Sequence, residues 1–434
     1  MTITRSDMKT GWEYFIVLLV FLVLHSCCFA GDTRITNSNN YQELNIRGGL
    51  PNFFEKAIRG DTVKVAYLGG SITAQDGWRV YSLDWFKQRF PNAVFTEINA
   101  AIGGTGSDFG VFRLNDQVLK FDPDLVFVEF AVNDKNTPAS KITRSMEGIV
   151  RQVWEHNPST DICFIYTLRD NFLDTAQNAT FPLSVKTMET VADKYQVPAI
   201  NFVFEVADQV KHNRLIFTGA TRELNDIKVF SPDGVHPYPE TGHRIYEEIL
   251  QRSFEKMIAV KPQPAKKHML PAPITPDYFA HTQMIDPEKG NLSKGWKIVQ
   301  VKASTDFSRF DRYLTQIGEA APGDTLSLRF KGTTVGIYDI IGPGSGRIEV
   351  TIDGQVKDTV YRFNAFCTYW MMSYFLLDHL PDKVHDVVFR VIPEAFDKAA
   401  ILKTRNQAIT DPGKYASINW YVGKILIDGY LQSP

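Results

Sequence analysis

Cysteine is scarce in this chain. The 434 residues include four cysteines, and two of them, Cys27 and Cys28, fall in an N-terminal stretch that we interpret as a targeting segment. Cys163 and Cys367 remain, in what we predict to be different domains. The sequence therefore implies no disulfide framework, even for an exported protein.

The chain also lacks an excess of charge of either sign. Its 47 basic and 49 acidic residues give a formal net charge of −2, and no basic block stands out. Binding to nucleic acid or to an anionic membrane surface is therefore not expected. Histidine, cysteine and carboxylate residues do not cluster at metal-ligand spacings, so the sequence predicts neither a metal nor another cofactor.

No apolar run is long enough to span a bilayer comfortably. The run from Phe15 to Leu24 follows basic residues and ends in small ones, which is typical of a signal peptide, predicted here over residues 1–30. Two interpretations of its cleavage stay open. Cys28-Phe29-Ala30 resembles an ordinary signal-peptidase site, whereas Leu24-His25-Ser26-Cys27 resembles a bacterial lipobox that would make Cys27 a lipid anchor. Both predict export, to the periplasm, to the cell surface as a lipoprotein, or to the medium.

What is present is ordinary globular composition, with 44% hydrophobic and 22% charged residues. Residues 45–258 alternate short apolar runs with amphipathic segments, which predicts a parallel sheet covered by helices. A helix beginning at Pro239 closes this region. The predicted strands are Val63–Leu68, Val94–Ile98, Leu125–Ala131, Ile162–Thr167 and Ala199–Phe202.

A proline-rich stretch marks the predicted domain boundary. Residues 259–276 contain five prolines and few apolar anchors, so we predict a semi-rigid linker there. In residues 277–434 short alternating runs are separated by turn residues, which predicts an antiparallel β-sandwich. Its predicted strands are Thr325–Phe330, Val335–Ile340, Arg347–Ile352, Thr359–Phe363, Val387–Val391 and Ile425–Ile427.

The first predicted strand ends abruptly in Gly69-Gly70-Ser71. A serine at the carboxyl end of a parallel strand is exposed where ligands bind in open α/β sheets. Ser71 is therefore a candidate nucleophile. Taken alone, the same pattern also fits a glycine turn in which Ser71 only caps the next helix.

A base and an orienting acid follow much later in the chain. Asp233 and His236 lie three residues apart on a proline-braced loop before the closing helix. A histidine within reach of the serine hydroxyl, held by a carboxylate, is the arrangement that nucleophilic catalysis by serine requires. Taken alone, the pair also fits a partly buried loop histidine and a turn residue.

Acyl transfer also needs donors for the developing oxyanion. We predict the backbone N–H groups of Ser71 and Gly104 and the side-chain amide of Asn133, because Gly104 and Asn133 each follow an apolar strand. Beside them, Asp134 is interpreted as a residue that fixes the Asn133 loop. Glu129, inside an apolar strand, is predicted to be buried and either paired or protonated.

Four blocks in this order resemble the SGNH hydrolases, also called GDSL-like esterases: Gly-x-Ser, Gly, x-x-Asn-Asp and Asp-x-x-His. The resemblance covers roughly residues 60–257, and the two-domain organisation resembles that of bacterial carbohydrate esterases. It implies a flavodoxin-like three-layer α/β fold, Ser71 as nucleophile, His236 as base and Asp233 as its partner, with Ser71, Gly104 and Asn133 as the oxyanion hole. Gly70 stands where the family name has Asp, which bears on substrate preference more than on chemistry.

Several alternatives stay open. The function we predict is hydrolysis of acetyl esters on a glycan or another small ester, and a lipid esterase or lysophospholipase is the second enzymatic possibility. A non-catalytic, carbohydrate-binding surface protein is the third. A dinucleotide loop at Gly104-Thr105-Gly106 is disfavoured because the spacing to Gly110 breaks the G-x-G-x-x-G pattern.

The predicted second domain contains an unusually aromatic run from Phe366 to Phe375. Aromatic faces stack on sugars, so Tyr369 and Trp370 are candidates for glycan binding. The alternative is that both rings fill the core or a contact between domains.

Overall fold

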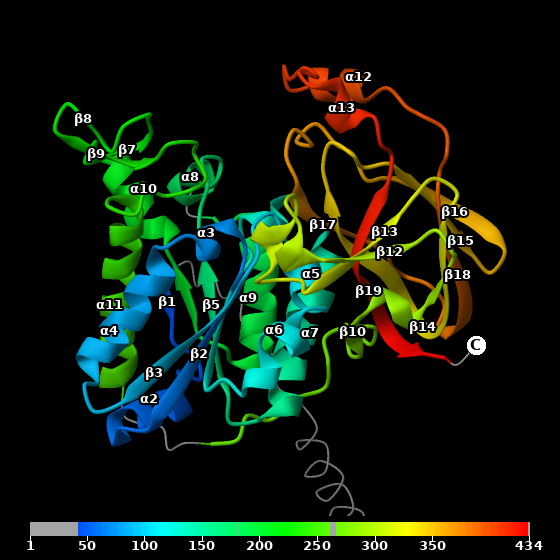
Figure 1. The fold of residues 1–434 in the computed structure, drawn as a ribbon. Coiled ribbons are helices and arrows are strands. Elements are labelled where there is room, and N and C mark those ends of the chain that lie inside the picture. Colours follow the sequence, from blue (N-terminus) through cyan, green and yellow to red (C-terminus); the bar gives the residue numbers. More distant parts are fainter. Residues whose placement is uncertain (1–41, 179, 261–265, 433–434) are drawn as a thin grey trace, which may run out of the picture. The chain divides into compact units, whose positions relative to one another are not determined.

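A computed structural model describes residues 42–178, 180–260 and 266–432, which belong to one compact unit (Figure 1). The predicted signal peptide, residues 1–30, and the candidate lipid anchor Cys27 lie outside the described residues. The described chain combines an α/β domain with a C-terminal antiparallel sheet domain, as the sequence predicts.

The α/β domain is built on a mostly parallel sheet with the strand order β1-β6-β5-β4-β2-β3. Its five parallel strands have the flavodoxin-like arrangement, in which the chain starts in the middle, moves to one edge and returns to build the other. A short antiparallel strand, β1 (Leu44–Asn45), completes the sheet beside β6. The parallel strands are β2 (Thr62–Gly69), β3 (Val94–Ala101), β4 (Leu125–Glu129), β5 (Asp161–Tyr166) and β6 (Ala199–Asn201).

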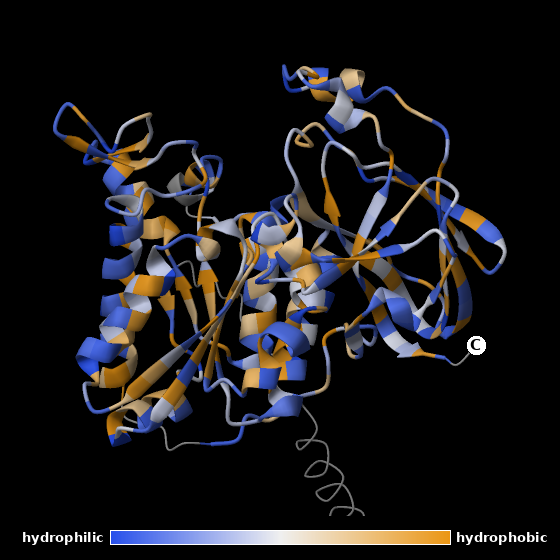
Figure 2. Cartoon of the chain, in the orientation of Figure 1, coloured by the Kyte–Doolittle hydropathy of each residue, from blue (hydrophilic) through white to orange (hydrophobic). Residues whose placement is uncertain are grey.

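Alternation along the strands explains the three layers. In β2, Val65 and Tyr67 pack into the apolar cluster on one face, and Ala66 and Leu68 pack into the cluster on the other. Both faces are covered, so β4 and β5 are buried along their whole length, as parallel strands require. Figure 2 shows these strands mostly as hydrophobic and the outer faces of the helices as hydrophilic.

Helices cover both faces of this sheet (Figure 1). Those contributing to the Tyr67 side are α2 (Pro51–Arg59), α4 (Trp78–Arg89), α8 (Phe172–Gln177), α10 (Val203–Lys211) and α11 (Gly242–Ala259). Those contributing to the Leu68 side are α5 (Ser107–Gly110), α6 (Leu114–Gln117), α7 (Ala139–His156) and α9 (Leu183–Tyr195).

The strand bounds differ from the sequence prediction by up to three residues, and two of the differing element boundaries in this domain lie next to the site. Helix α11 begins at Gly242 and not at Pro239, because the chain first turns at Tyr238, whose carbonyl accepts the His243 N–H. Strand β4 ends at Glu129, two residues early, because Phe130 already begins the turn that leads to Asn133. A small sheet of β7 (Leu215–Thr218), β8 (Glu223–Leu224) and β9 (Ile227–Ser231) precedes α11.

The C-terminal domain is organised around one long strand, β14 (Thr325–Ile341). The sequence predicts two strands here, but the chain passes Gly332 to Thr334 with a register shift and no turn. The first part of β14 pairs with β18 and the second with β17, while β19 runs along its other side. The other elements are β10 (Thr282–Ile285), β11 (Asn291–Leu292), β12 (Lys297–Gln300), β13 (Gln316–Ala320), β15 (Arg347–Ile352), β16 (Gln355–Tyr361), β17 (Met371–Leu377), β18 (Lys383–Val391), α12 (Lys398–Lys403), α13 (Pro412–Tyr415) and β19 (Trp420–Leu431).

The described part of the proline-rich stretch, residues 266–276, is attached to the α/β domain. The His268 ring stacks on Trp154 at 4.5 Å between centroids and lies 2.7 Å from the Asp161 carboxylate. Further along, the buried Glu147 of α7 accepts the backbone N–H groups of Ile274 and Thr275. These contacts hold residues 266–276 against the surface that they cross.

One apolar cluster joins the two sheets. It runs from the Leu68 side of the parallel sheet through Phe109 and Phe112 of the α5 region to Tyr338 on β14 and Leu426 on β19. The buried Arg144 of α7 adds an ion pair to Asp277, with N and O 3.0 Å apart. The C-terminal domain therefore shares its core with the α/β domain.

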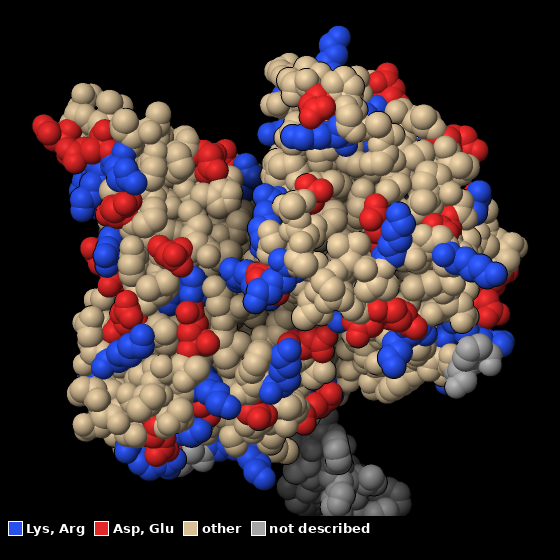
Figure 3. Space-filling view, in the orientation of Figure 1, with Lys and Arg blue, Asp and Glu red and all other residues tan. Residues whose placement is uncertain are grey.

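The surface carries mixed charge. Figure 3 shows basic and acidic side chains interspersed over the face in view, in keeping with the balanced composition. Among the residues that the structure describes, no helix combines the length and apolar character that crossing a membrane requires.

Candidate active site

Three strand ends meet at Ser71. Gly69 at the end of β2 pairs with Ala101 of β3 on one side and with Glu129 of β4 on the other. Ser71 begins the short helix α3 (Ser71–Ala74) directly after this point. The loops that follow β3 and β4 therefore lie on either side of the serine.

Ser71, His236 and Asp233 form a hydrogen-bonded row. The Ser71 Oγ lies 2.8 Å from His236 Nε2, and His236 Nδ1 lies 2.7 Å from Asp233 Oδ2. The residues come from two elements 165 positions apart in sequence, the turn after β2 and the loop between β9 and α11. With Nδ1–H donated to the carboxylate, Nε2 is free to accept the serine proton.

Asp233 is held as a carboxylate. Partial burial opposes its ionisation, but hydrogen bonds from the His236 ring and from the backbone N–H groups of His236 and Val235 outweigh burial and keep the pKa of Asp233 well below its ordinary value. The Ser231 hydroxyl donates a further hydrogen bond to Oδ1 at 3.1 Å. Asp233 therefore stays negative beside the imidazole at any pH near neutrality.

The sequence analysis did not single out His243. Its ring links the segment that follows Ser71 to the loop that carries His236. Its Nδ1 accepts the backbone N–H of Trp78, and its Nε2 lies 3.2 Å from the Gln75 side-chain oxygen. Burial, helped by the nearby His236, lowers the pKa of His243 to about 3, so the ring is neutral and Nε2 donates. The Gln75 amide continues to the carbonyl of Pro237 in the His236 loop. The sequence around His243 shows only a single histidine on an amphipathic helix, which does not predict these hydrogen bonds.

The loop after β3 brings Gly103 beside Ser71, and Gly104 follows in the chain. A Cβ atom added to Gly103 would lie 3.5 Å from the Ser71 Cβ, which is van der Waals contact. Gly104 has a φ of +76°, in the left-handed region that side chains other than glycine rarely adopt. Another residue at position 104 would adopt this backbone conformation only with strain.

Asn133 approaches from the other side, at the start of the 3₁₀ turn η2 (Asn133–Asn136). Its amide touches Gly70: a Cβ on Gly70 would lie 2.1 Å from Asn133 Oδ1. Gly70 has a φ of −91°, which is open to any residue, so the requirement is for space and not for backbone freedom. At this position, where the family name has Asp, the Asn133 amide of this structure occupies the space beside Gly70.

Two buried carboxylates lie behind these loops: Glu129, whose burial the sequence predicts, and Asp134. Glu129 accepts hydrogen bonds from Thr73 and Thr167, each at 2.7 Å, and burial raises its pKa. Asp134 accepts the backbone N–H of Ser107 at 3.1 Å, which ties the Asn133 turn to the loop after β3. Burial raises the pKa of Asp134 to about 7 against the opposing effect of Ser107.

Arg113 is a second residue that no sequence pattern marked. Its guanidinium is fully buried and donates to the carbonyl of Gly69 at 3.0 Å and to that of Ala100. Burial lowers its pKa to about 10, so it stays charged at neutral pH. It therefore fixes the last residues of β2 and β3, immediately before Ser71 and Gly103.

The two aromatic candidates of the C-terminal domain have different surroundings. Trp370 is half-buried between Phe307 and Tyr421, with ring centroids 5.0 and 4.9 Å away. Tyr369 is 50% exposed, and Arg309 lies over its ring. None of the contacts within the described chain joins either ring to Ser71 or His236.

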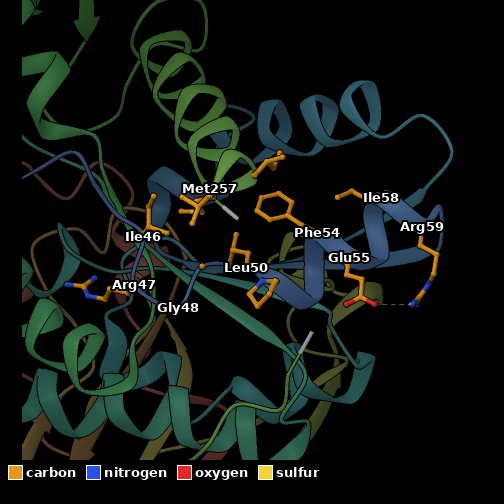
Figure 4. Close-up of a pocket in the computed structure, with 13 residues that line it drawn as sticks. Ile46, Arg47, Gly48, Leu50, Phe54, Glu55, Ile58, Arg59 and Met257 are labelled. Carbon is orange, nitrogen blue, oxygen red and sulfur yellow. Dashed lines mark ion pairs between the residues drawn. The ribbon is translucent and has the colours of Figure 1, made fainter. Parts of the chain in front are cut away.

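An apolar cavity of about 400 Å³ lies elsewhere on the α/β domain (Figure 4). Its lining includes Leu50, Phe54, Ile58 and Met257, and it contains no serine, cysteine or histidine. Met257 lies near the C-terminal end of α11, a helix of 18 residues and so about 27 Å long, whose other end follows the His236 loop. This cavity offers no nucleophile.

Within residues 42–178, 180–260 and 266–432 no cluster of His, Cys, Asp or Glu is placed to hold a metal ion.

A strand-end serine bonded to a histidine, on an open parallel sheet of this order, defines a hydrolase of the SGNH type. Residues 67–245 match the model of the GDSL-like lipase/acylhydrolase family, and this part of the chain is a domain of that family. The protein is thus a carboxylic ester hydrolase with an additional C-terminal sheet domain.

Similar solved structures extend over both domains. A two-domain esterase (CEX) active on acetylated mannans, crystallised with mannopentaose, is 21% identical with a TM-score of 0.68, covering 92% of this chain and 99% of its own. A second structure of a two-domain esterase (CEX) active on acetylated mannans matches with equal score and identity over 91% of this chain and 99% of its own. At this identity the likeness establishes the fold. No curated protein matches the chain.

Replacing Gly70 tests the contact with Asn133. We expect Gly70→Ala to lower kcat on an aryl acetate by roughly 10²-fold, because the added methyl displaces the Asn133 amide, which the sequence analysis predicts to be an oxyanion donor. In an Asn133→Ala background the same substitution should have little further effect. Steady-state kinetics of the four proteins checks this, and equal losses in both backgrounds would contradict it.

The raised pKa of Asp134 predicts a pH-dependent stability. The pKa of Asp134 in the fold, about 7, lies above the ordinary 3.8. The contribution of Asp134 to the free energy of unfolding is therefore fully present below about pH 4 and is lost as the pH rises through 7. The free energy of unfolding of the wild type, minus that of Asp134→Asn, should therefore fall between pH 4 and pH 8. Denaturant unfolding at both pH values measures it, and a difference that grows with pH would refute the prediction.

Proposed function

We propose that this protein is an exported serine esterase that removes acetyl groups from carbohydrates. The observation that supports this most is the row of Ser71, His236 and Asp233, with links of 2.8 and 2.7 Å, at the carboxyl edge of the sheet. The loops of Gly104 and Asn133 flank the same serine, where they can supply donors.

In the first half of the reaction His236 Nε2 takes the proton of Ser71, and Oγ attacks the ester carbonyl carbon. The carbonyl oxygen becomes an oxyanion, which accepts hydrogen bonds from the N–H groups of Ser71 and Gly104 and from the Asn133 amide. Asp233, fixed as a carboxylate, stabilises the imidazolium. The bond to the sugar oxygen then breaks, and the imidazolium gives that oxygen its proton.

The second half repeats these steps with water. His236 takes a proton from a water molecule, whose oxygen attacks the acetyl carbon on Ser71. The same donors hold the second oxyanion. Its collapse breaks the bond to Oγ, His236 returns the proton to Ser71, and acetic acid is released. No group outside the chain and water is needed to balance these steps.

The substrate class rests on the likeness to CEX, whose fold matches this chain over both domains. That protein is active on acetylated mannans, so we propose an acetylated polysaccharide as substrate and a mannan as the first to test. Tyr369 and Trp370 are proposed to contact the part of the polysaccharide that extends onto the C-terminal domain.

The substrate proposal is tested by acetate release. The wild type should release acetate from an acetylated mannan, and Ser71→Ala should lose roughly 10³-fold or more of this rate, because the nucleophile is gone. Ser159→Ala, which removes an exposed hydroxyl away from the row, should behave like the wild type. Acetate release by Ser71→Ala at the wild-type rate would contradict the proposal.

A series of aryl esters separates the alternatives. Rates that fall steeply from acetate to octanoate support a deacetylase, since a small acyl site excludes a long chain. Faster turnover of octanoate or of a lysophospholipid would identify a lipid esterase. Retention of the protein on a glycan column without hydrolysis of any ester would identify a binding protein.

Export is the remaining part of the proposal, and it rests on residues 1–30. Mass spectrometry of the protein made in bacterial cells should find either Gly31 as the first residue or a lipid-modified Cys27. Protein that keeps Met1 in the cytoplasm would contradict export.

A further inference from the structure

The loop that carries Gly104 is held from two directions. From within the α/β domain, Asp134 accepts the Ser107 N–H. From the C-terminal domain, Tyr374 of β17 places its hydroxyl 3.5 Å from the backbone nitrogen of Gly106 and 2.6 Å from Asp108 Oδ1. The Gly106 N–H donates to this hydroxyl, and the hydroxyl donates to the carboxylate.

Packing fixes the direction of the Tyr374 side chain. Its ring stacks on Phe109, with centroids 4.7 Å apart and planes 16° from parallel. Tyr338, paired with Tyr374 across β14 and β17, packs on the same Phe109 at 4.6 Å. Phe109 is fully buried, so the Tyr374 hydroxyl is aimed at the loop by a rigid aromatic cluster.

The partners of Tyr374 favour this arrangement. Asp108 also accepts the Phe109 N–H at 2.9 Å, and Lys141 lies 3.4 Å from its other oxygen. Burial and the neighbouring Asp108 raise the pKa of Tyr374 well above its ordinary value. The tyrosine thus stays protonated and continues to donate.

We infer that Tyr374 is a positioning residue for ester hydrolysis: through Gly106 and Asp108, the C-terminal domain sets the direction of the Gly104 N–H. This inference rests on the proposed function. Gly104 lies two residues before Gly106, and its left-handed backbone has no side chain to brace it. A donor misplaced by about 1 Å can cost up to 10²-fold in rate, and the cost falls on the transition state more than on the bound substrate.

The test is Tyr374→Phe in the full-length protein, which removes the hydroxyl and keeps the ring on Phe109. We expect kcat for an aryl acetate to fall about tenfold, with KM changed less than twofold and the thermal midpoint nearly unchanged. The rate of inactivation by an aryl phosphonate should fall in parallel, because its phosphoryl oxygen takes the position of the oxyanion.

Tyr338→Phe is the matched control. It removes a hydroxyl from the same cluster, and this hydroxyl has no hydrogen-bond partner among the described residues. Its kcat should stay at the wild-type value. Equal kcat in both variants would overturn the inference, and so would a loss in Tyr374→Phe that appears only in KM.

A second variant covers the case in which Tyr374→Phe does not fold. Asp108→Ala removes the acceptor on the loop itself, and it should also lower kcat without raising KM. A wild-type kcat in Asp108→Ala would then overturn the inference. Full activity of Ser71→Ala would instead sink the proposed function, so the two failures are distinguishable.

Discussion

The site depends on the register of three parallel strands. Because Gly69 of β2 pairs with Ala101 and with Glu129, the strands β2, β3 and β4 end at one level. Parallel pairing sends all three chains out at the same edge. The buried Arg113 secures this level, since its guanidinium binds the carbonyls of Gly69 and Ala100. A slip of one residue would separate the serine from the loops on either side.

Buried polar groups convert that register into a rigid site. Glu129 holds Thr73 and Thr167 behind the serine, while Asp134 holds Ser107 and with it the loop after β3. Each of these groups would be costly to bury without its partners. The same requirement that stabilises the fold therefore fixes the backbone around Ser71, and the neutral His243 does so for the His236 loop.

The C-terminal domain is part of this scaffold and not an appendage on a free tether. Its strands share one apolar cluster with the α/β domain, and residues 266–276 are held by contacts to Glu147 and Asp161. A shared core lets a residue of β17 reach a loop that follows β3. Tyr374 thus contacts Gly106 and Asp108, although none of the described contacts of the second domain reaches Ser71.

The sequence by itself determined the α/β class, the strand positions and the proximity of Ser71, Gly104 and Asn133, because alternation and strand ends are local signals. It also marked Asp233 and His236 by their spacing. It left out Arg113, His243 and Tyr374, and it divided β14 into two strands. Only the tertiary structure decided these, since the roles of the three side chains depend on partners distant in sequence. Gly70 shows the difference most simply: the sequence marks it as a departure, and only the structure shows that the Asn133 amide packs against it.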